Sequence, residues 1–276
     1  MGEETFTGLV AEVQKLRVEL ARTRTELAAL RAAVGPADAE PNGGGFATIY
    51  PAFEDRFRGT EAEVRERLAV YLPRVRAAVR LDGPGPRALD VGPGRGEWLR
   101  LLADAGVPAV GVENNAAMAE RLRGRELDVV PGDAIGHLGA VRPGSLDVVT
   151  AFHVVEHLDI DALLALLAGA HRALRPGGLL VVETPNPTNL VMGACNFYLD
   201  PTHRVPIPPA QLEFLVRTVG FAPPEILPLH PKEEFDLSGL TLSGVEPAAS
   251  AAVADALARG LFGPQDYAVL AVRQPG

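Results

Sequence analysis

A heptad pattern of apolar positions runs through residues 6–34, near the start of the chain. Its core positions follow one another in alternating steps of four and three: Leu9, Val13, Leu16, Leu20, Thr23, Leu27, Leu30 and Val34. The flanking positions carry opposite charges, with Glu12, Glu19 and Glu26 on one side and Arg17, Arg24 and Arg31 on the other. In a parallel pair of helices each glutamate faces an arginine of the partner, whereas an antiparallel pair would oppose like charges. The pattern predicts a parallel coiled-coil homodimer over residues 1–34, and a single amphipathic helix lying on its own domain is the alternative.

A segment rich in glycine and proline, residues 35–45, follows the heptads and predicts a flexible linker. The remainder, residues 46–276, is expected to form one domain that opens with a helical cap over 46–85. Within this cap, residues 61–80 have a helical pattern with a break at Pro73, because proline cannot donate the backbone hydrogen bond that a helix interior needs.

Short apolar runs alternate with amphipathic ones through residues 87–272. The runs expected as strands are 87–92, 109–113, 127–131, 146–152, 178–184 and 267–272, and those expected as helices are 96–105, 115–123, 160–174 and 209–219. Strands separated by helices are typical of the α/β class, with a Rossmann-like, doubly wound and mostly parallel sheet. Such sheets bind ligands beyond the carboxyl ends of their strands. Residues 185–208 and 222–265 lack a clear period, and we expect them to be irregular and to form an acceptor pocket.

Composition narrows the possible classes of partner and compartment. The net charge of −9 gives no basic surface for phosphates and disfavours nucleic acid as a partner. Cys195 is the single cysteine, which excludes an internal disulfide and fits a reducing compartment. The sequence has neither an apolar run long enough for a membrane span nor a leader-like N-terminus, so we expect a cytoplasmic protein.

A glycine-rich turn lies between the first expected strand and the helix after it. The segment LDVGPGRGEWLRLL (89–102) places Gly92, Gly94 and Gly96 there, and glycines let the backbone approach a ligand closely. A dinucleotide-binding loop would need a further glycine at 97, where Glu97 stands, and no Tyr-x-x-x-Lys pair appears; both disfavour a dinucleotide-dependent epimerase. Asp90 would repel a pyrophosphate but suits a cationic, amino-acid-bearing ligand.

Two further acidic residues follow the next expected strands. Glu113 ends the second strand, where a carboxylate can accept hydrogen bonds from both hydroxyls of a ribose. Asp133 follows the third, where it can meet an adenine amino group. In this order, these residues resemble the class I S-adenosylmethionine-dependent methyltransferases over about 87–272. The resemblance implies that the glycine turn passes the methionine moiety of S-adenosylmethionine, that Glu113 binds the ribose, and that further cofactor contacts come from Asp90, Trp98, Asn114, Asp133, Ala134 and Phe152.

A narrower likeness lies in the segments FEDRFRG (53–59), GRGEWL (94–99) and YLDPTHRVP (198–206). They are similar to bacterial methyltransferases of saccharide gene clusters, including those that terminate O-antigen chains. This resemblance implies a saccharide or glycosylated acceptor. It also implies that Arg58 binds the cofactor's carboxylate by a bidentate hydrogen bond, and an exposed surface arginine is the alternative.

Histidines gather where the fourth expected strand ends. In AFHVVEHL (151–158), His153, Glu156 and His157 have the spacing that shares one face of a helical turn, and His203 stands in the later loop DPTHR (200–204). These four residues are candidate ligands of a divalent cation, Mg²⁺ or Mn²⁺. The set resembles the Glu-x-x-Glu-His plus distant His arrangement of Mg²⁺-dependent small-RNA 2′-O-methyltransferases, and its extra nitrogen shifts preference toward transition metals.

Two other roles for the histidines remain open. His153, His157 or His203 can act as a general base without a metal, or the group can be purely structural. A hydroxyl nucleophile must lose a proton and an unprotonated amine need not, so the histidines favour O-methylation. We therefore expect an enzyme that methylates a sugar hydroxyl. N-methylation of an aminosugar and a noncatalytic coiled-coil scaffold for glycosyltransferases are the alternatives.

Overall fold

The computed structural model describes residues 46–80, 85–231, 237 and 239–274, together with Lys15 and Arg22. The expected coiled coil and linker therefore lie outside the described residues, apart from those two positions. The chain divides into two compact units: Pro51–Pro231 with Pro264–Gly276, and Met1–Tyr50 with Lys232–Gly263.

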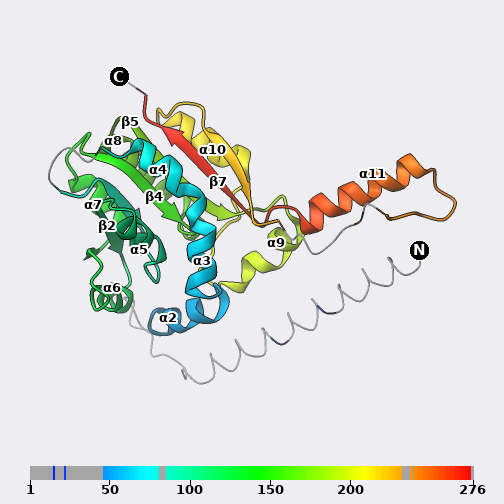
Figure 1. Cartoon of the computed structure of the whole chain (residues 1–276), viewed down its shortest axis with the longest axis horizontal. Helices are drawn as coiled ribbons and strands as arrows, with labels where there is room; N and C mark the ends of the chain where they lie inside the picture. Colours follow the sequence, from blue (N-terminus) through cyan, green and yellow to red (C-terminus); the bar gives the residue numbers. More distant parts are fainter. Residues whose placement is uncertain are drawn as a thin grey trace. The chain divides into compact units, whose positions relative to one another are not determined.

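A seven-stranded sheet forms the centre of the first unit (Figure 1), in the order β3-β2-β1-β4-β5-β7-β6. Strands β1 to β5 run parallel, and β7 lies antiparallel between β5 and β6. Their bounds are β1 Ala88–Val91, β2 Ala109–Glu113, β3 Val129–Pro131, β4 Leu146–Phe152, β5 Leu174–Pro185, β6 Glu225–Leu229 and β7 Asp266–Val272. This order confirms the expected α/β fold with a mostly parallel sheet.

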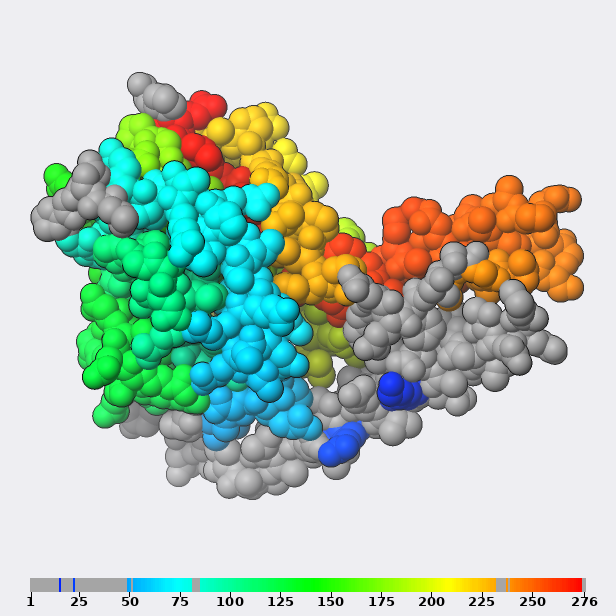
Figure 2. All heavy atoms as spheres, in the orientation of Figure 1, coloured from blue at the N-terminus to red at the C-terminus, as the bar shows by residue number. Residues whose placement is uncertain are grey.

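Helices cover both faces of the sheet, which explains why β4 is buried at every residue and is mostly apolar, with Asp147 and Thr150 as its polar residues. On one face pack α3 Glu61–Leu68, the 3₁₀ turn η1 Ala69–Tyr71, α4 Leu72–Ala78, α5 Glu97–Asp104 and α6 Ala116–Arg123. The other face is covered by α7 Ala134–Ala140, α8 Ile160–Ala173 and α10 Pro209–Thr218. The space-filling view shows the cyan of α4 beside the amber of β6 (Figure 2), where Arg74 and Glu225 form an ion pair of 2.7 Å.

The helical cap starts and breaks where the sequence indicates. Thr60 caps α3 with Glu63 in a reciprocal capping box, and Pro73 lies in the first turn of α4, where its missing N–H costs nothing. The cap ends against the sheet: the backbone N–H of Arg80 donates to Oδ2 of the buried Asp147 at 3.0 Å. The cap is thus fastened at the amino end of β4.

The segments expected to be irregular contain regular structure, which corrects the prediction. Residues 222–265 include β6, an edge strand that pairs only with β7, and α11 Pro247–Leu257 with the π-helical turn η4 Ala258–Phe262. Residues 185–208 include α9 Leu190–Ala194 and the turn η3 Asn196–Leu199. β6 carries Pro228 and mixed exposure, so it has no apolar period.

The second unit is described over fewer residues. Its apolar cluster contains Leu237, Leu240, Ala254 and Phe262, the last two from α11 and η4. The boundary between the units falls within α2 Phe46–Phe57. Within the described ranges, no helix combines the length and the apolar character that crossing a bilayer requires.

Candidate active site

The glycine turn between β1 and α5 has a backbone conformation and surroundings that disfavour residues with a Cβ atom. Gly92 and Gly94 have φ of +63° and +54°, the left-handed region that favours glycine. A Cβ at Gly92 would lie 2.8 Å from Cγ2 of Val154, and one at Gly94 would lie 3.2 Å from Oε1 of Glu54. The turn is therefore enclosed by the end of β4 on one side and by α2 on the other, with bare backbone between them.

Two buried carboxyl groups lie at the carboxyl ends of β1 and β2. Asp90 is 1% exposed and accepts a hydrogen bond of 2.7 Å from Oγ1 of Thr150. Glu113 accepts one of 2.7 Å from the backbone N–H of Asn115. Burial raises the pKa of each carboxyl to about 7. A cationic ligand with ribose hydroxyls would favour the ionised forms of both groups.

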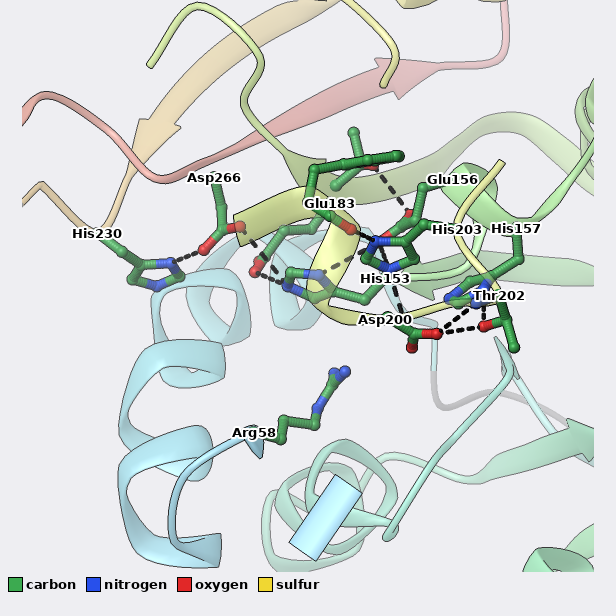
Figure 3. Close-up of polar contacts among 12 residues, drawn as sticks. Arg58, His153, Glu156, His157, Glu183, Asp200, Thr202, His203, His230 and Asp266 are labelled. Carbon is green, nitrogen blue, oxygen red and sulfur yellow. Dashed lines mark hydrogen bonds and ion pairs between the residues drawn. The ribbon is translucent and has the colours of Figure 1, made fainter. Parts of the chain in front are cut away.

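Arg58, at the carboxyl-terminal side of α2, brings a positive charge to the same region. Its Nη1 lies 3.9 Å from Oε1 of the buried Glu54. Its charge also lowers the pKa of Asp90 and of His153 as a secondary influence, so all three groups share one electrostatic environment. Figure 3 shows the Arg58 side chain pointing toward the side on which His153 lies. The arginine is thus well placed for an anionic ligand group near the glycine turn.

The remaining residues predicted to bind the cofactor fall into two groups. Asn114 and Asp133 are exposed, Ala134 is half-buried, and Asp133 also caps α7 by accepting a hydrogen bond of 2.6 Å from the backbone N–H of Gly136. Trp98 is only 2% exposed, and its ring lies 5.3 Å from that of the buried Phe152. These two aromatic residues belong to the apolar core, and their contact with the cofactor stays a prediction.

His153 breaks the helical face that the spacing predicted. Its φ is +55°, and its backbone N–H donates to the carbonyl of Glu183 at 2.9 Å. Helical structure begins only afterwards, in the 3₁₀ turn η2 Val155–His157. His153, Glu156 and His157 therefore do not share one face. They divide into two clusters that meet at Glu156 (Figure 3).

The first cluster surrounds His153 with carboxylates. Its Nδ1 lies 3.3 Å from Oε1 of Glu156, and its Nε2 lies 3.2 Å from Oε1 of Glu183 and 3.9 Å from Oδ1 of Asp266. Burial opposes the charged imidazole, but pairing with Glu156 and Glu183 overcomes it and raises the pKa of His153 to about 10. His153 is a cation near neutral pH. The predicted roles of His153 as general base or metal ligand stay predictions, and both require the imidazole to lose a proton; with Glu183 and Asp266 it forms a second group that could hold a metal ion.

Two more residues complete the surroundings of His153. The hydroxyl of Tyr71 donates to Oε2 of Glu183, and Nδ1 of His230 lies 2.9 Å from Oδ2 of Asp266. Sequence reasoning missed Tyr71, Glu183, His230 and Asp266. The one local signal was Glu183, an acidic residue inside an otherwise apolar strand.

The second cluster, which we call the trio, consists of Glu156, His157 and His203. Each offers one ligand atom, and these atoms all lie within 4.8 Å of one another. Nδ1 of His203 donates to the carbonyl of Phe197 at 2.6 Å, which leaves Nε2 with its lone pair. Burial lowers the pKa of His203, in keeping with a neutral ring.

Two consecutive hydrogen bonds, through Thr202 to Asp200, hold His157 in the same tautomer. Its Nδ1 lies 2.8 Å from Oγ1 of Thr202, and this hydroxyl donates onward to Oδ1 of Asp200 at 2.6 Å. Since the threonine hydrogen is used on Asp200, the hydroxyl accepts from Nδ1–H of His157, and Nε2 carries the lone pair in the neutral ring. The structure thus brings three of the four predicted metal ligands together, while His153 lies in the other cluster.

Comparison with known proteins identifies the family. Residues 58–225 match the family model described as a methyltransferase domain. A structure of an S-adenosylmethionine-dependent methyltransferase from Archaeoglobus fulgidus is 35% identical, covers 81% of this chain and 99% of its own, and superposes with a TM-score of 0.72. The chain belongs to the class I S-adenosylmethionine-dependent methyltransferases.

Curated methyltransferase relatives share only part of their length with this one. A probable S-adenosylmethionine-dependent methyltransferase of Mycolicibacterium smegmatis is 32% identical over 139 residues, 50% of this chain and 52% of that protein. A ubiquinone biosynthesis O-methyltransferase of Xanthomonas campestris is 34% identical over 116 residues, 40% and 48% of the two chains. The chain therefore spans about half the length of the curated relatives it matches.

The residues of this methyltransferase fit the family's cofactor. The glycine turn offers bare backbone that a Cβ would obstruct, and Asp90 and Glu113 are buried carboxyls that lack full compensation. Phosphoethanolamine N-methyltransferase 2 of Haemonchus contortus in complex with S-adenosyl-L-methionine shares the fold, at 18% identity, a TM-score of 0.51 and coverage of 82% of this chain and 60% of its own. S-adenosylmethionine is thus the cofactor of this family, and the residues predicted to bind it stay a prediction.

Proposed function

We propose that the protein transfers the methyl group of S-adenosylmethionine to a hydroxyl oxygen of a saccharide or glycosylated metabolite. The observation that carries this proposal is the trio, because the hydrogen bonds at Nδ1 of His157 and of His203 leave Nε2 of each neutral ring as the acceptor, at the strand edge that borders the glycine turn. Val154, whose side chain contacts the turn at Gly92, precedes Glu156 by only two positions. The trio therefore lies close to the turn at which we expect the cofactor.

The cofactor supplies an electrophilic methyl group and a neutral leaving group. In the transfer, the acceptor oxygen forms a bond to the methyl carbon, and the electron pair of the broken C–S bond stays on sulfur as S-adenosylhomocysteine. The trio assists loss of the hydroxyl proton, either by accepting it on a histidine Nε2 or by holding a divalent cation that would lower the pKa of the hydroxyl. In this proposal Arg58 binds the cofactor's carboxylate, while Asp90 and the glycine turn hold its amino-acid end. Glu113 holds the ribose, and Asp133 with Ala134 borders the adenine.

Two observations favour a hydroxyl over an amine as the acceptor. An unprotonated amine needs no base, so the trio would have no task in N-methylation. Among the relatives, those of Xanthomonas are O-methyltransferases of ubiquinone biosynthesis. The saccharide itself rests on the sequence likeness in segments 53–59, 94–99 and 198–206. A parallel homodimer through residues 1–34 and a cytoplasmic location also remain proposals.

The test begins with binding and proceeds to turnover. S-adenosylhomocysteine should bind by calorimetry and NAD should not; absence of S-adenosylhomocysteine binding would overturn the proposal. Formation of S-adenosylhomocysteine is then measured with a panel of saccharides, each offered with its amino-substituted counterpart. We expect turnover with the hydroxyl member of a pair and its loss in His203→Ala, with His171→Gln as the matched control. Turnover with the amine alone would show N-methylation instead.

A further inference from the structure

We propose that Glu156, His157 and His203 form the binding site of one divalent transition-metal ion, in which His153 takes no part. Binding of the ion is independent of the proposed function, whereas the role given to it below rests on that function. Two imidazole nitrogens and one carboxylate oxygen supply the protein's share of the ligands.

The two histidines are oriented as metal-ligating histidines usually are. A ligating imidazole almost always donates its other N–H to a carbonyl, carboxylate or similar group, which fixes ring and tautomer. His203 does so to the carbonyl of Phe197 at 2.6 Å, and His157 does so through Thr202 to Asp200. The ring centroids of the two histidines are 4.7 Å apart. A third ligand atom from Glu156 lies within 4.8 Å of both their nitrogens.

Glu156 supplies the carboxylate oxygen of the proposed site. Its side chain is fully buried, and Oε2 accepts a hydrogen bond of 2.9 Å from Oγ1 of Thr184. No residue in the described part of the chain gives Oε1 a hydrogen bond; Nδ1 of His153 and Nε2 of His203 stand at ion-pair distances of 3.3 and 3.8 Å. His153 offsets part of the charge on this oxygen, and Oε1 still has a lone pair for a cation held between His157 and His203.

His153 is adjacent to this site without being a ligand of it. Its Nδ1 faces Glu156 and its Nε2 faces Glu183 at 3.2 Å, so both ring nitrogens are directed at carboxylates. A metal bound at His153 would have to displace one of these pairs. His153 instead holds the Glu156 side chain in place, which makes it a positioning residue.

The donor set selects the kind of metal. Mg²⁺ prefers oxygen ligands and keeps several waters, which argues against the Mg²⁺ of the sequence prediction. Two histidines and one carboxylate suit Mn²⁺, Fe²⁺, Co²⁺ or Zn²⁺ and leave coordination positions open. Open positions fit neighbouring oxygens of a polyol acceptor. A hydroxyl bound there has a lower pKa, so its proton passes to solvent as the methyl group arrives.

The experiment uses the full chain, freed of metal by dialysis against a chelator. Co²⁺ is titrated into it while the visible absorption and the heat of binding are recorded. We expect one Co²⁺ per chain, with affinity lost in His157→Ala and His203→Ala and kept in His171→Gln, whose imidazole packs on Phe221 elsewhere. Thr202→Val, which removes the hydroxyl behind His157, should weaken binding by about 10- to 100-fold.

A second measurement distinguishes failure of the metal site from failure of the proposed function. Binding of S-adenosylhomocysteine to each variant shows that it is folded, and it tests the cofactor site without the metal. No Co²⁺ binding by the wild type, or binding that survives both histidine changes, would overturn the metal site even if the enzyme methylates. If Co²⁺ binds as expected and S-adenosylhomocysteine does not, the proposed function fails while the metal site stands.

Discussion

Glu113 shows how the ionisation of a single residue governs ligand binding. Its pKa is about 7 in the cofactor-free protein because it is buried, whereas accepting two ribose hydroxyls favours the carboxylate. We expect the affinity for S-adenosylhomocysteine to rise as the pH increases from about 6 to about 8. Calorimetric titrations across this range measure the effect. Glu113→Gln should bind more weakly and with a flatter pH profile, and a wild-type profile that is already flat would contradict the assignment.

The same shift carries a stability effect of defined sign. The folded pKa of Glu113 lies above its ordinary value of 4.5, so the protonated group favours folding. That contribution is complete below about 4.5 and is lost as the pH rises through about 7. Bound S-adenosylhomocysteine reverses the preference, so the rise in melting temperature on binding should be larger at the alkaline end of the range.

At the scale of residues, the sequence predicts those site residues that lie at the end of a strand. The glycine turn, Asp90, Glu113, Glu156 and His157 each lie near a recognisable apolar run, whereas His203 lies in the segment 185–208, which lacks a clear period. Glu183 and Asp266 meet because β5 and β7 pair antiparallel, with Pro185 opposite Asp266, across a separation in sequence that no motif records. Both carboxylates add to the pairing of His153 with Glu156, so the full set of acidic groups around His153 could not be predicted from the sequence.

At the scale of elements, Asp147 fastens the helical cap to the sheet. It is fully buried at the start of β4, where it accepts from the backbone of Arg80 and pairs with Arg175. Asp147→Ala leaves the partners without their carboxylate and should lower the free energy of unfolding by about 3 kcal/mol. Asp104→Ala removes an exposed ion pair with Arg65 and should cost less than about 1 kcal/mol. Denaturant unfolding of both variants makes the comparison, and equal losses would show that Asp147 is not an anchor.

The stability that Asp147 contributes should also depend on pH in a defined direction. Burial alone would raise the pKa of Asp147, but hydrogen bonds from the Arg80 backbone and Arg175 hold it below its usual range. The stability that it contributes is present above the ordinary carboxyl pKa and is lost as the pH falls below it. The difference between wild type and Asp147→Ala should therefore narrow in acid.

Elements that the sequence predicts well are those with a strong period or a buried run. β2 and β4 have the bounds expected for them, since both faces of these strands are covered. α7 was not predicted because its segment, AIGHLGA, is short and contains two glycines, so it depends on the Asp133 cap and on packing against α8. β6 was missed because an edge strand needs only one partner and tolerates proline.

At the scale of the whole molecule, residues 1–34 are predicted to join two active sites in one particle. The heptad charges predict a parallel pair, and this can be tested in the full chain by exchanging them. A chain carrying Glu12→Arg, Glu19→Arg and Glu26→Arg would oppose arginine with arginine, and we expect light scattering to show a monomer. Mixed with a chain carrying Arg17→Glu, Arg24→Glu and Arg31→Glu, it should form a one-to-one heterodimer. A single helix packed on its own domain gives the opposite result, because neither set of changes would then alter the mass of the particle. S-adenosylhomocysteine binding should survive in every mixture, since the cofactor residues all lie after the predicted linker.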